Sequence, residues 1–323
     1  MIRAVSLRCL ANYTSLPMHT RLKVCFVVTF VFGLAISVFA QSGDICPEKA
    51  ADFANVQQRA NANDPSAQTA LAFCYDFGRN VEPSRKENML WLERAANQSY
   101  APAEYELGRI YLYGRGVPTD YDKALIWERK AAEQGDPRAQ RDLAFMYERG
   151  FGVKADPVQA AEWNRKAATQ GDPEAQAHLA RALADGSGVK KNPVEARQWY
   201  TKAAGQEHPE AQLQVARSYA GKGDCVHAIH WYKEAAASGQ TQAMYELGKL
   251  YAAKKCGADR VNAFQWFSTG ARFGSQESKT EADQVTPSLS SAQRKSVHLA
   301  VERWIKQHPG SQKEEDEEER EGK

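Results

Sequence analysis

The stretch AQRDLAFMYERGFGVKADPVQAAEWNRKAATQG, residues 139–171, recurs with small changes along most of the chain. Its opening alanine has a constant step of 36 residues through five copies, and its tryptophan has the same step through four. Six copies, the last two with shorter turns, occupy residues 64–274. The opening alanines and the tryptophans are Ala67, Ala103, Ala139, Ala175, Ala211 and Ala243, and Trp91, Trp127, Trp163, Trp199, Trp231 and Trp266. Self-similarity at this period predicts a solenoid of stacked repeats.

Each copy is predicted to form two helices joined by a turn. The first, helix A, begins after an N-cap residue that is followed by proline, as in Asp136-Pro137. Glycines such as Gly150 end it, because glycine tolerates the left-handed backbone that closes a helix. Helix B begins at positions such as Asn192, where Glu195 three residues later predicts a capping box.

The apolar pattern of the repeat predicts a core shared between neighbouring copies. In helix A, Ala139, Leu143 and Tyr147 have the spacing of a single helical stripe. Helix B carries the tryptophan, followed by a pair of alanines such as Ala167-Ala168 that lets neighbouring helices approach closely around the indole. We therefore interpret the six repeated tryptophans as core residues.

These residues resemble the Sel1-like repeats, a subclass of the tetratricopeptide-type helical hairpins. The family motif runs A-x-x-x-L-G-x-x-Y-x-x-G-x-G-V, followed by A-x-x-W and K-A-A-x-x-G, and copies two to four fit it almost throughout. In the first copy Asn80 replaces the second glycine, and the last two copies lose most of the turn. The resemblance covers about two thirds of the chain. It implies an all-α, right-handed superhelical solenoid of about six two-helix repeats with N- and C-terminal capping helices.

Residues 1–40 have the features of a secretory signal peptide. Arg21 and Lys23 precede an apolar run over residues 24–39, and Val38 and Ala40 occupy the small-residue positions before a cleavage site. A start at Met18 would give a signal of ordinary length. The alternative is a membrane anchor, but the run is shorter than the ~20 apolar residues of a spanning helix. We expect cleavage after Ala40 and a periplasmic or secreted protein.

The charge balance argues against nucleic acid and charged membrane surfaces as main partners. The whole chain has a formal net charge of +2, and removal of residues 1–40 leaves 38 basic and 40 acidic residues, a net charge of −2. We expect one continuous solenoid, a monomer without stable membrane insertion after signal cleavage and without a cofactor.

Cysteine content predicts two disulfide bonds after export. An even number of cysteines in an oxidising compartment indicates disulfides, and four cysteines allow three connectivities. We favour a pair between the first two, which links the N-terminal cap segment, residues 41–63, to the first repeat, and a pair between the last two. A zinc site built from Cys225, His227, His230 and Cys256 is an alternative. The four cysteines are Cys46, Cys74, Cys225 and Cys256.

No catalytic residue is predicted. Ser187-Gly188-Val189-Lys190 fits the S-x-x-K motif of serine penicillin-binding enzymes, but it falls in a repeat turn and the companion S-D-N and K-T-G motifs are absent. Some cysteine-rich members of the family that this chain resembles have been linked to β-lactam binding. A cell-wall-associated hydrolase or β-lactam-binding protein is therefore the alternative function.

The surface of helix A opposite its core stripe is the candidate binding site. Counted from the opening alanine as zero, positions 2, 6 and 10 of helix A, here called the groove positions, lie about opposite the core positions and can line the concave side of a solenoid. Six of their eighteen residues are basic, six are aromatic and one is acidic. Arginine and aromatic residues dominate binding hot spots. The alternative is that some aromatics only pad the contact between successive A helices. The candidate residues are Tyr105, Arg109, Tyr113, Arg141, Phe145, Arg149, Arg181, Arg217, Tyr245 and Lys249.

The sequence beyond the last repeat predicts a cap and a tail. Residues 275–310 contain an amphipathic stretch, Ser288 to Gln307, that we expect to form one helix capping the stack. Residues 311–323 are strongly acidic and are predicted to be disordered, as a solubilising tail or as a competitor that folds back on the basic groove positions.

The sequence thus predicts an exported, non-enzymatic adaptor or scaffold that binds another protein or peptide, acidic in character, through its groove. The family resemblance implies the same class of function, since its known members are mostly adaptors and scaffolds in bacterial envelopes, host contact and protein quality control. A structural envelope scaffold that joins its machinery through the convex face is a further alternative.

Overall fold

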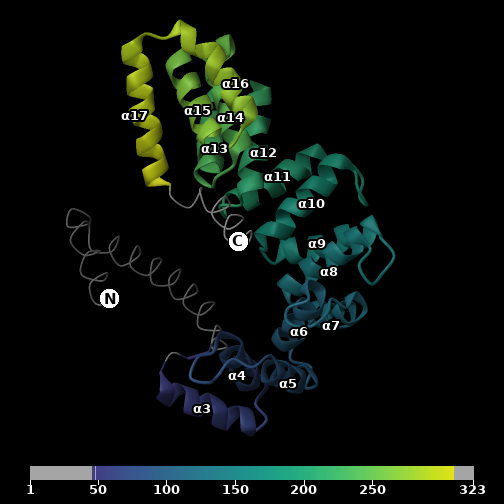
Figure 1. Cartoon of the computed structure of the whole chain (residues 1–323). Helices are drawn as coiled ribbons and strands as arrows, with labels where there is room; N and C mark the ends of the chain where they lie inside the picture. Colours follow the sequence, from purple (N-terminus) through teal and green to yellow (C-terminus); the bar gives the residue numbers. More distant parts are fainter. Residues whose placement is uncertain (1–45, 48, 309–323) are drawn as a thin grey trace, which may run out of the picture. The chain divides into compact units, whose positions relative to one another are not determined.

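The structure is a computed structural model that describes residues 46–47 and 49–308. These residues form fifteen α-helices and two short 3-10 helices, without a strand, and the helices carry the labels of Figure 1, starting at α3. The chain divides into two compact units, the first ending at Ile110 and the second beginning at Tyr111, inside α6 (Ala101–Tyr113). The predicted all-α architecture of paired helices is confirmed. The predicted signal peptide and acidic tail lie outside the described residues.

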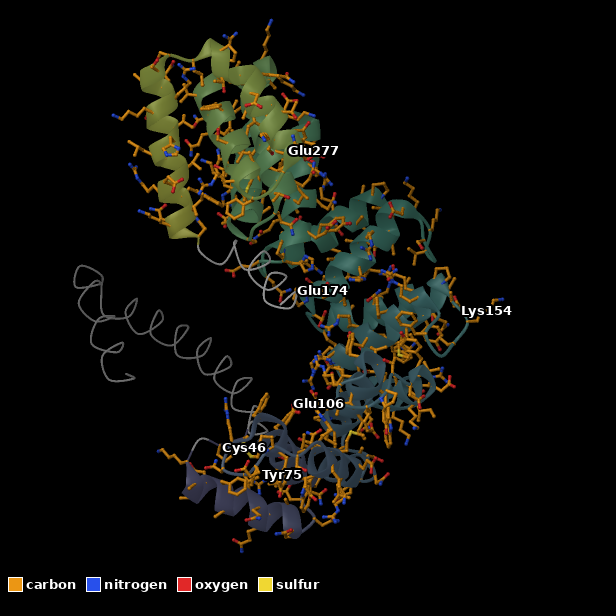
Figure 2. All side chains as sticks on the ribbon, viewed as in Figure 1. Cys46, Tyr75, Glu106, Lys154, Glu174 and Glu277 are labelled. Carbon is orange, nitrogen blue, oxygen red and sulfur yellow. A yellow bond between two sulfur atoms is a disulfide. The ribbon has the colours of Figure 1, made fainter. Side chains whose placement is uncertain are left out.

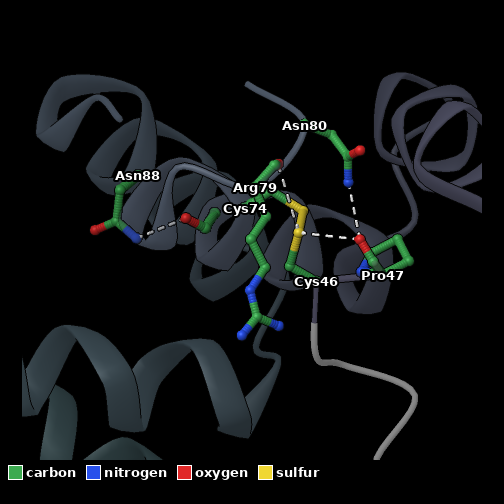
Figure 3. The surroundings of a disulfide bond; sticks show 7 residues. Cys46, Pro47, Cys74, Arg79, Asn80 and Asn88 are labelled. Atoms are coloured by element: carbon green, nitrogen blue, oxygen red, sulfur yellow. Dashed lines mark hydrogen bonds between the residues drawn. A yellow bond between two sulfur atoms is a disulfide. The ribbon is translucent and has the colours of Figure 1, made fainter. Parts of the chain in front are cut away.

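The first unit contains α3 (Ala50–Asn61), α4 (Pro65–Phe77), α5 (Arg85–Ala96) and most of α6. Helix α3 packs on α4, and α4 packs on α5. A disulfide between Cys46 and Cys74 ties the segment before α3 to the first repeat (Figure 3). Asn80 adopts a left-handed backbone at φ 61° and donates its side-chain amide to the carbonyl of Pro47 at 2.9 Å. Asparagine thus replaces the repeat's second glycine in a turn whose side chain also forms a hydrogen bond with the N-terminal cap segment.

The second unit is a row of helices in which each repeat helix packs on the next. The repeat helices end with α15, and α16 and α17 both pack on α15. The helices are α7 (Tyr121–Glu133), α8 (Pro137–Arg149), α9 (Pro157–Thr169), α10 (Pro173–Asp185), α11 (Pro193–Ala204), α12 (Pro209–Lys222), α13 (Cys225–Ala237), α14 (Thr241–Ala252), α15 (Arg260–Arg272), α16 (Gln276–Val285) and α17 (Ser291–Gln307).

Helix starts follow the predicted N-cap chemistry, with one exception. Asp136 caps α8 by accepting from the backbone amides of Arg138 and Ala139. Asn192 caps α11 through the amide of Glu195, but the Glu195 carboxylate accepts from the side chains of Arg165 and Trp199 instead of the Asn192 backbone. The prediction of a capping box there is therefore wrong.

The second glycine of the repeat turn sets how closely neighbouring repeats approach. Gly152 and Gly188 have φ values of +64° and +68°. A Cβ at Gly152 would overlap the carbonyl of Tyr121, and one at Gly188 would overlap the carbonyl of Pro157. Both carbonyls lie in the first turn of helix B of the preceding repeat, so any side chain here would push two repeats apart.

A relay of buried glutamines joins successive helices and was missed from sequence. Gln140 is 5% exposed, donates to the carbonyl of Ala132 at 3.1 Å and accepts from Gln170 at 2.9 Å. The same arrangement recurs in two other copies. The matching residues are Gln68, Ala60 and Gln98, and Gln176, Ala168 and Gln206.

The repeated tryptophans are less buried than the sequence indicates. Trp91 and Trp266 are 8% and 4% exposed, whereas the other four lie at intermediate burial. The lysine three residues later covers the open face of the ring in three copies, with Lys166 Nζ 3.5 Å from the ring centre of Trp163. The equivalent pairs are Trp127 with Lys130 and Trp199 with Lys202. The lysine of the K-A-A motif therefore covers the face of the tryptophan ring that the core leaves open to solvent.

The predicted single C-terminal helix is instead two helices. Helix α16 (Gln276–Val285) packs on α15, a 3-10 turn follows at Thr286–Ser288, and α17 begins at Ser291 rather than Ser288. Ser290 caps α17 in a full capping box with Gln293. On α17, Trp304 meets Trp266 edge to face with ring centres 5.8 Å apart, so this helix covers the last repeat as expected.

Candidate functional site

The groove positions divide into a buried and an exposed set. The position-2 residues Tyr105, Ala177 and Leu213 are at most 5% exposed, and Leu213 shares a core cluster with Met244 of the next A helix. The alternative that such side chains pad the contact between A helices fits these residues, including the candidate Tyr105, whereas Arg141 and Tyr245 at the same position are only half-buried. Most of the exposed surface comes from positions 6 and 10, where Tyr113 is 51% exposed.

Three of the arginines at the groove positions, Arg141, Arg181 and Arg217, are paired with carboxylates. Arg141 lies 3.0 Å from Asp142 and 3.2 Å from Asp172, the N-cap residue of α10. Arg181 lies 3.5 Å from Glu148 of the preceding repeat. The count of one acidic residue among the groove positions understates the acidic groups beside them, because helix position 3 supplies residues such as Asp142 and position 9 supplies Glu148.

Glu246, at position 3 of α14, joins three helices. Arg217 of α12 donates Nε to both carboxylate oxygens of Glu246 at 3.0 and 3.1 Å, and its NH2 group also donates to Oε1. The hydroxyl of Tyr232, on α13, donates to Oε2 at 2.8 Å. Burial raises the pKa of Glu246, but hydrogen bonds from Arg217, Gln242 and Tyr232 outweigh it and leave that pKa below its ordinary value.

The residue after each repeated tryptophan forms the floor between A helices, which sequence analysis also missed. Tyr232 reaches Glu246 of the next repeat, and Asn164 lines a cavity with residues of α8 and α10. Burial raises the pKa of Tyr200 to about 12. The corresponding residue in the second copy, Glu128, is fully buried. We define the A-helix face as helix A positions 3, 6 and 10, the half-buried position-2 residues Arg141 and Tyr245, and this residue after the tryptophan.

Cations stacked on aromatic rings make up the most exposed part of the A-helix face. Arg149 lies 5.6 Å from the ring centre of Phe145 on α8, and Lys249 lies 5.2 Å from that of Tyr245 on α14. Both cations are exposed and form no ion pair within the described residues. On the first unit, Arg109 lies 5.7 Å from the ring centre of Tyr105. The pairs on α8 and α14 leave a cation with its charge uncompensated next to an aromatic platform.

Glu174, labelled in Figure 2, contacts two histidines on the second unit. His178 Nε2 is 3.5 Å and His208 Nε2 3.2 Å from its carboxylate oxygens. Hydrogen bonds from His178 and His208 hold the pKa of Glu174 well below its ordinary value. His208 is the N-cap residue of α12, so this contact links two successive A helices.

The second disulfide joins Cys225 and Cys256, giving the connectivity favoured from sequence. That bond removes both sulfur ligands of the zinc alternative, and His227 binds Asp224 instead at 2.7 Å. Within the described ranges, no three His, Cys, Asp or Glu residues are grouped so that they could hold a metal ion.

Ser187, the serine of the S-x-x-K match, is exposed in the turn between α10 and α11. In the described residues no side chain forms a hydrogen bond with its hydroxyl. A nucleophilic serine requires a base within hydrogen-bonding distance, and the turn provides none.

A search of residues 46–47 and 49–308 finds no helix with the length and hydropathy needed to cross a membrane.

Comparison with known proteins identifies relatives of the whole repeat region. Among solved structures, c5321, a protective antigen of uropathogenic Escherichia coli with an SLR fold, is 32% identical with a TM-score of 0.70 over 79% of this chain and 56% of its own. A Sel1 repeat protein from Oxalobacter formigenes is 34% identical with a TM-score of 0.58, over 65% of this chain and 89% of its own. This chain thus spans little more than half of the Escherichia coli antigen. No curated protein matches it.

The Sel1 repeat pattern matches six consecutive segments, residues 65–100, 101–136, 137–172, 173–208, 209–240 and 241–274. These segments coincide with the helix pairs from α4 to α15. The fold of Sel1 repeats is a scaffold for protein interactions, and the family is generally non-catalytic. With six matched repeats and two related solved structures above 30% identity, the chain belongs to the Sel1 repeat family.

Proposed function

We propose that this Sel1 repeat protein is an exported adaptor that binds another protein through a groove lined by the A-helix face. The observation that carries the proposal is the exposed pairing of Arg149 with Phe145 and of Lys249 with Tyr245. Aromatic and arginine side chains held in place by each other lose little conformational freedom on binding, which favours their use as anchors.

Two features support export. Both disulfides require an oxidising compartment to persist, and residues 1–40 have the pattern of a secretory signal. A periplasmic or secreted location provides that compartment.

The charges of the A-helix face support a particular kind of partner. Arg141, Arg181 and Arg217 already contact carboxylates of the same chain, so they contribute little to attracting an acidic partner. Arg149 and Lys249 have no such carboxylate, and a partner carrying a carboxylate opposite each would gain a charge-assisted hydrogen bond. The expected partner is therefore an extended segment with acidic residues at intervals, not a uniformly acidic one.

Site-specific photo-crosslinking tests the proposal. A photoreactive phenylalanine analogue at Tyr113, on the A-helix face, should crosslink the partner in cells. The same analogue at Ile126 of α7, which is 54% exposed against 51% for Tyr113, serves as the matched control on helix B. Crosslinks from the α7 position alone would place binding on the helix B side and reject the groove.

A further inference from the structure

A cavity opens beyond the last repeat, between α15, α16 and α17 (Figure 1). Its volume is about 460 Å³, which lies within the range of ligand-binding pockets. Helices α16 and α17 each pack on α15, so α15 forms the floor and the other two helices form the walls. We call this cavity the C-terminal groove. The apolar residues that line it are Phe264 and Ala271 of α15, Ala282 of α16, and Val297 and Val301 of α17.

Helix α16 has the place of a seventh helix A. Its N-cap is Ser275, and Ser278, three residues later, matches the opening alanine of the other A helices, which also stands three residues after the N-cap. Ser278 is fully buried, and those alanines are buried too. Core positions 4 and 8 of α16 are therefore Ala282 and Thr286. In the six repeats, position 4 is leucine or valine and position 8 is tyrosine or leucine, so α16 has smaller side chains at both.

These small side chains explain why the groove is open. In α10, Leu179 and Leu183 at positions 4 and 8 share a core cluster with Ala196, on helix B of the same repeat. Ala282 and Thr286 line the groove instead, and α17, the helix that follows α16, packs on α15. The groove is therefore core volume that the side chains of this hairpin leave unfilled. A leucine and an aromatic ring one helical turn apart would restore what the other repeats have there.

Two unpaired cations flank the groove. Lys279 on α16 and Arg294 on α17 are exposed and form no ion pair within the described residues. Arg272 and Glu302 also line it, but they pair with each other at 3.2 Å. Asp283 is the remaining acidic residue of the lining, so with neutral histidine the walls carry a net positive charge. Carboxylates on either side of an apolar ligand would gain charge-assisted hydrogen bonds from the two cations.

We propose that the C-terminal groove binds an amphipathic helix of a partner protein. This helix inserts a leucine and an aromatic side chain, one turn apart, beside Ala282 and Thr286, and it places carboxylates near Lys279 and Arg294. Helices that bind in apolar grooves commonly anchor through side chains at this spacing. A helix is the expected occupant because α11 covers the corresponding surface of α10 in the fourth repeat. The groove is separate from the A-helix face, so it adds a second docking site to the proposed function.

Titration of the full chain with a labelled peptide, followed by fluorescence anisotropy, tests the proposal. The probe is an alanine-based helical peptide of about fifteen residues, with leucine and phenylalanine one turn apart and a glutamate on each side of them. Its control peptide has alanine at both apolar positions. We expect the probe to bind at least about tenfold more tightly than the control, because two large apolar side chains leave water. Equal binding of the two peptides, or no binding of the probe in the millimolar range, would overturn the proposal.

A variant that fills the groove tests where the probe binds. Thr286→Tyr restores the aromatic ring of a regular repeat, so it should weaken probe binding at least about tenfold without lowering the midpoint of thermal unfolding. Thr280→Tyr makes the same substitution on the exposed side of α16, outside the groove, and should leave binding unchanged. Unchanged affinity in Thr286→Tyr would reject the groove as the binding site. If probe binding fails while Tyr113 still crosslinks a partner, the adaptor function stands without this second site.

Charge variants test the same site without filling it. Lys279→Glu with Arg294→Glu should weaken probe binding about tenfold, whereas Lys295→Glu with Lys306→Glu, on α17 outside the groove, should not. Dodecanoate and a second copy of the chain are rival occupants. Tighter binding of dodecanoate than of the probe, or a dimer in light scattering that Thr286→Tyr dissociates, would assign the groove to that occupant and overturn the proposal.

Discussion

The side-chain amide of Gln170 donates to the side-chain oxygen of Gln140, thirty residues earlier in the chain, at a distance of 2.9 Å. Gln140 in turn donates its own side-chain amide to the carbonyl of Ala132, near the end of α7. A single glutamine thereby joins the end of one helix B to the turn after the next, across the interface between repeats. This explains why glutamine recurs at both positions.

Removing this relay should destabilise the repeat stack. Gln140→Leu removes the hydrogen bonds of Gln140 to the Ala132 carbonyl and from the Gln170 amide, which both keep a bond with the Gly135 backbone. We expect the loss of two bonds to lower the free energy of unfolding by about 1–3 kcal/mol. Gln214→Leu removes only a surface contact with Glu210 and should change it by less than about 0.5 kcal/mol. Urea unfolding followed by circular dichroism measures both, and equal effects would show that the relay adds no stability.

The second turn glycine should tolerate no side chain. Gly188→Ala puts a Cβ onto the carbonyl of Pro157 and strains a left-handed backbone, so we expect a loss of at least about 2 kcal/mol. Gly171 also has a positive φ, +102°, but has no heavy atom within 4 Å of the added Cβ. Gly171→Ala should therefore lower the free energy of unfolding by only about 1 kcal/mol. Thermal melts of both variants measure the two losses. A smaller loss at Gly188 than at Gly171 would contradict the packing argument.

The half-open tryptophan should contribute less than a fully buried one. Trp163→Ala is expected to cost about 2–3 kcal/mol, below the ~3–5 kcal/mol of an enclosed indole, because part of the ring already faces solvent. Lys166→Gln removes the cation over that ring and should cost about 0.5 kcal/mol. Chemical denaturation of the two single variants and the double variant measures the coupling, and zero coupling energy would show that the lysine only shares the surface with the indole.

Stability should depend on pH through Glu246. Its pKa is lower in the folded chain than in the unfolded chain, so its contribution is fully present above the unfolded value near 4.5 and is lost as the pH falls through the folded value. At pH 7 Glu246→Gln should be less stable than wild type by about 1–2 kcal/mol, since Arg217 is partly exposed. That difference should shrink as the pH drops below about 4.5. A difference that is constant between pH 7 and pH 3 would contradict the Arg217 contact.

Repeat spacing and local helix signals were enough to predict the fold. An N-cap residue before proline begins six of the repeat helices, and a glycine follows the end of several of them; these signals are local. Helix α16 was missed because its sequence, QESKTEADQV, holds only two apolar residues, Ala282 and Val285, and shows no stripe. That helix packs on α15. A contact with another helix of this kind cannot be predicted from the local sequence pattern.

The candidate site was only partly predictable for a related reason. Periodicity within helix A identifies which of its residues are exposed, but it does not show the partners that come from other helices. Arg217 meets a carboxylate 29 residues away, and Asn164 enters the same surface from helix B. Both contacts depend on how one repeat is placed against the next, so charge counted along one helix overestimated the basic character of the groove.

The most direct test of the adaptor function is a comparison of three baits in a pulldown from envelope extract of the source cell. The baits are the mature wild type, a face variant with Arg149→Glu and Lys249→Glu, and a control variant with Lys154→Glu in the turn after α8 and Lys233→Glu on α13. Circular dichroism must show equal folding of all three. We expect the wild type and the control to retain the same partner and the face variant to lose it. Retention by the face variant, or loss in the control alone, would contradict binding through the A-helix face.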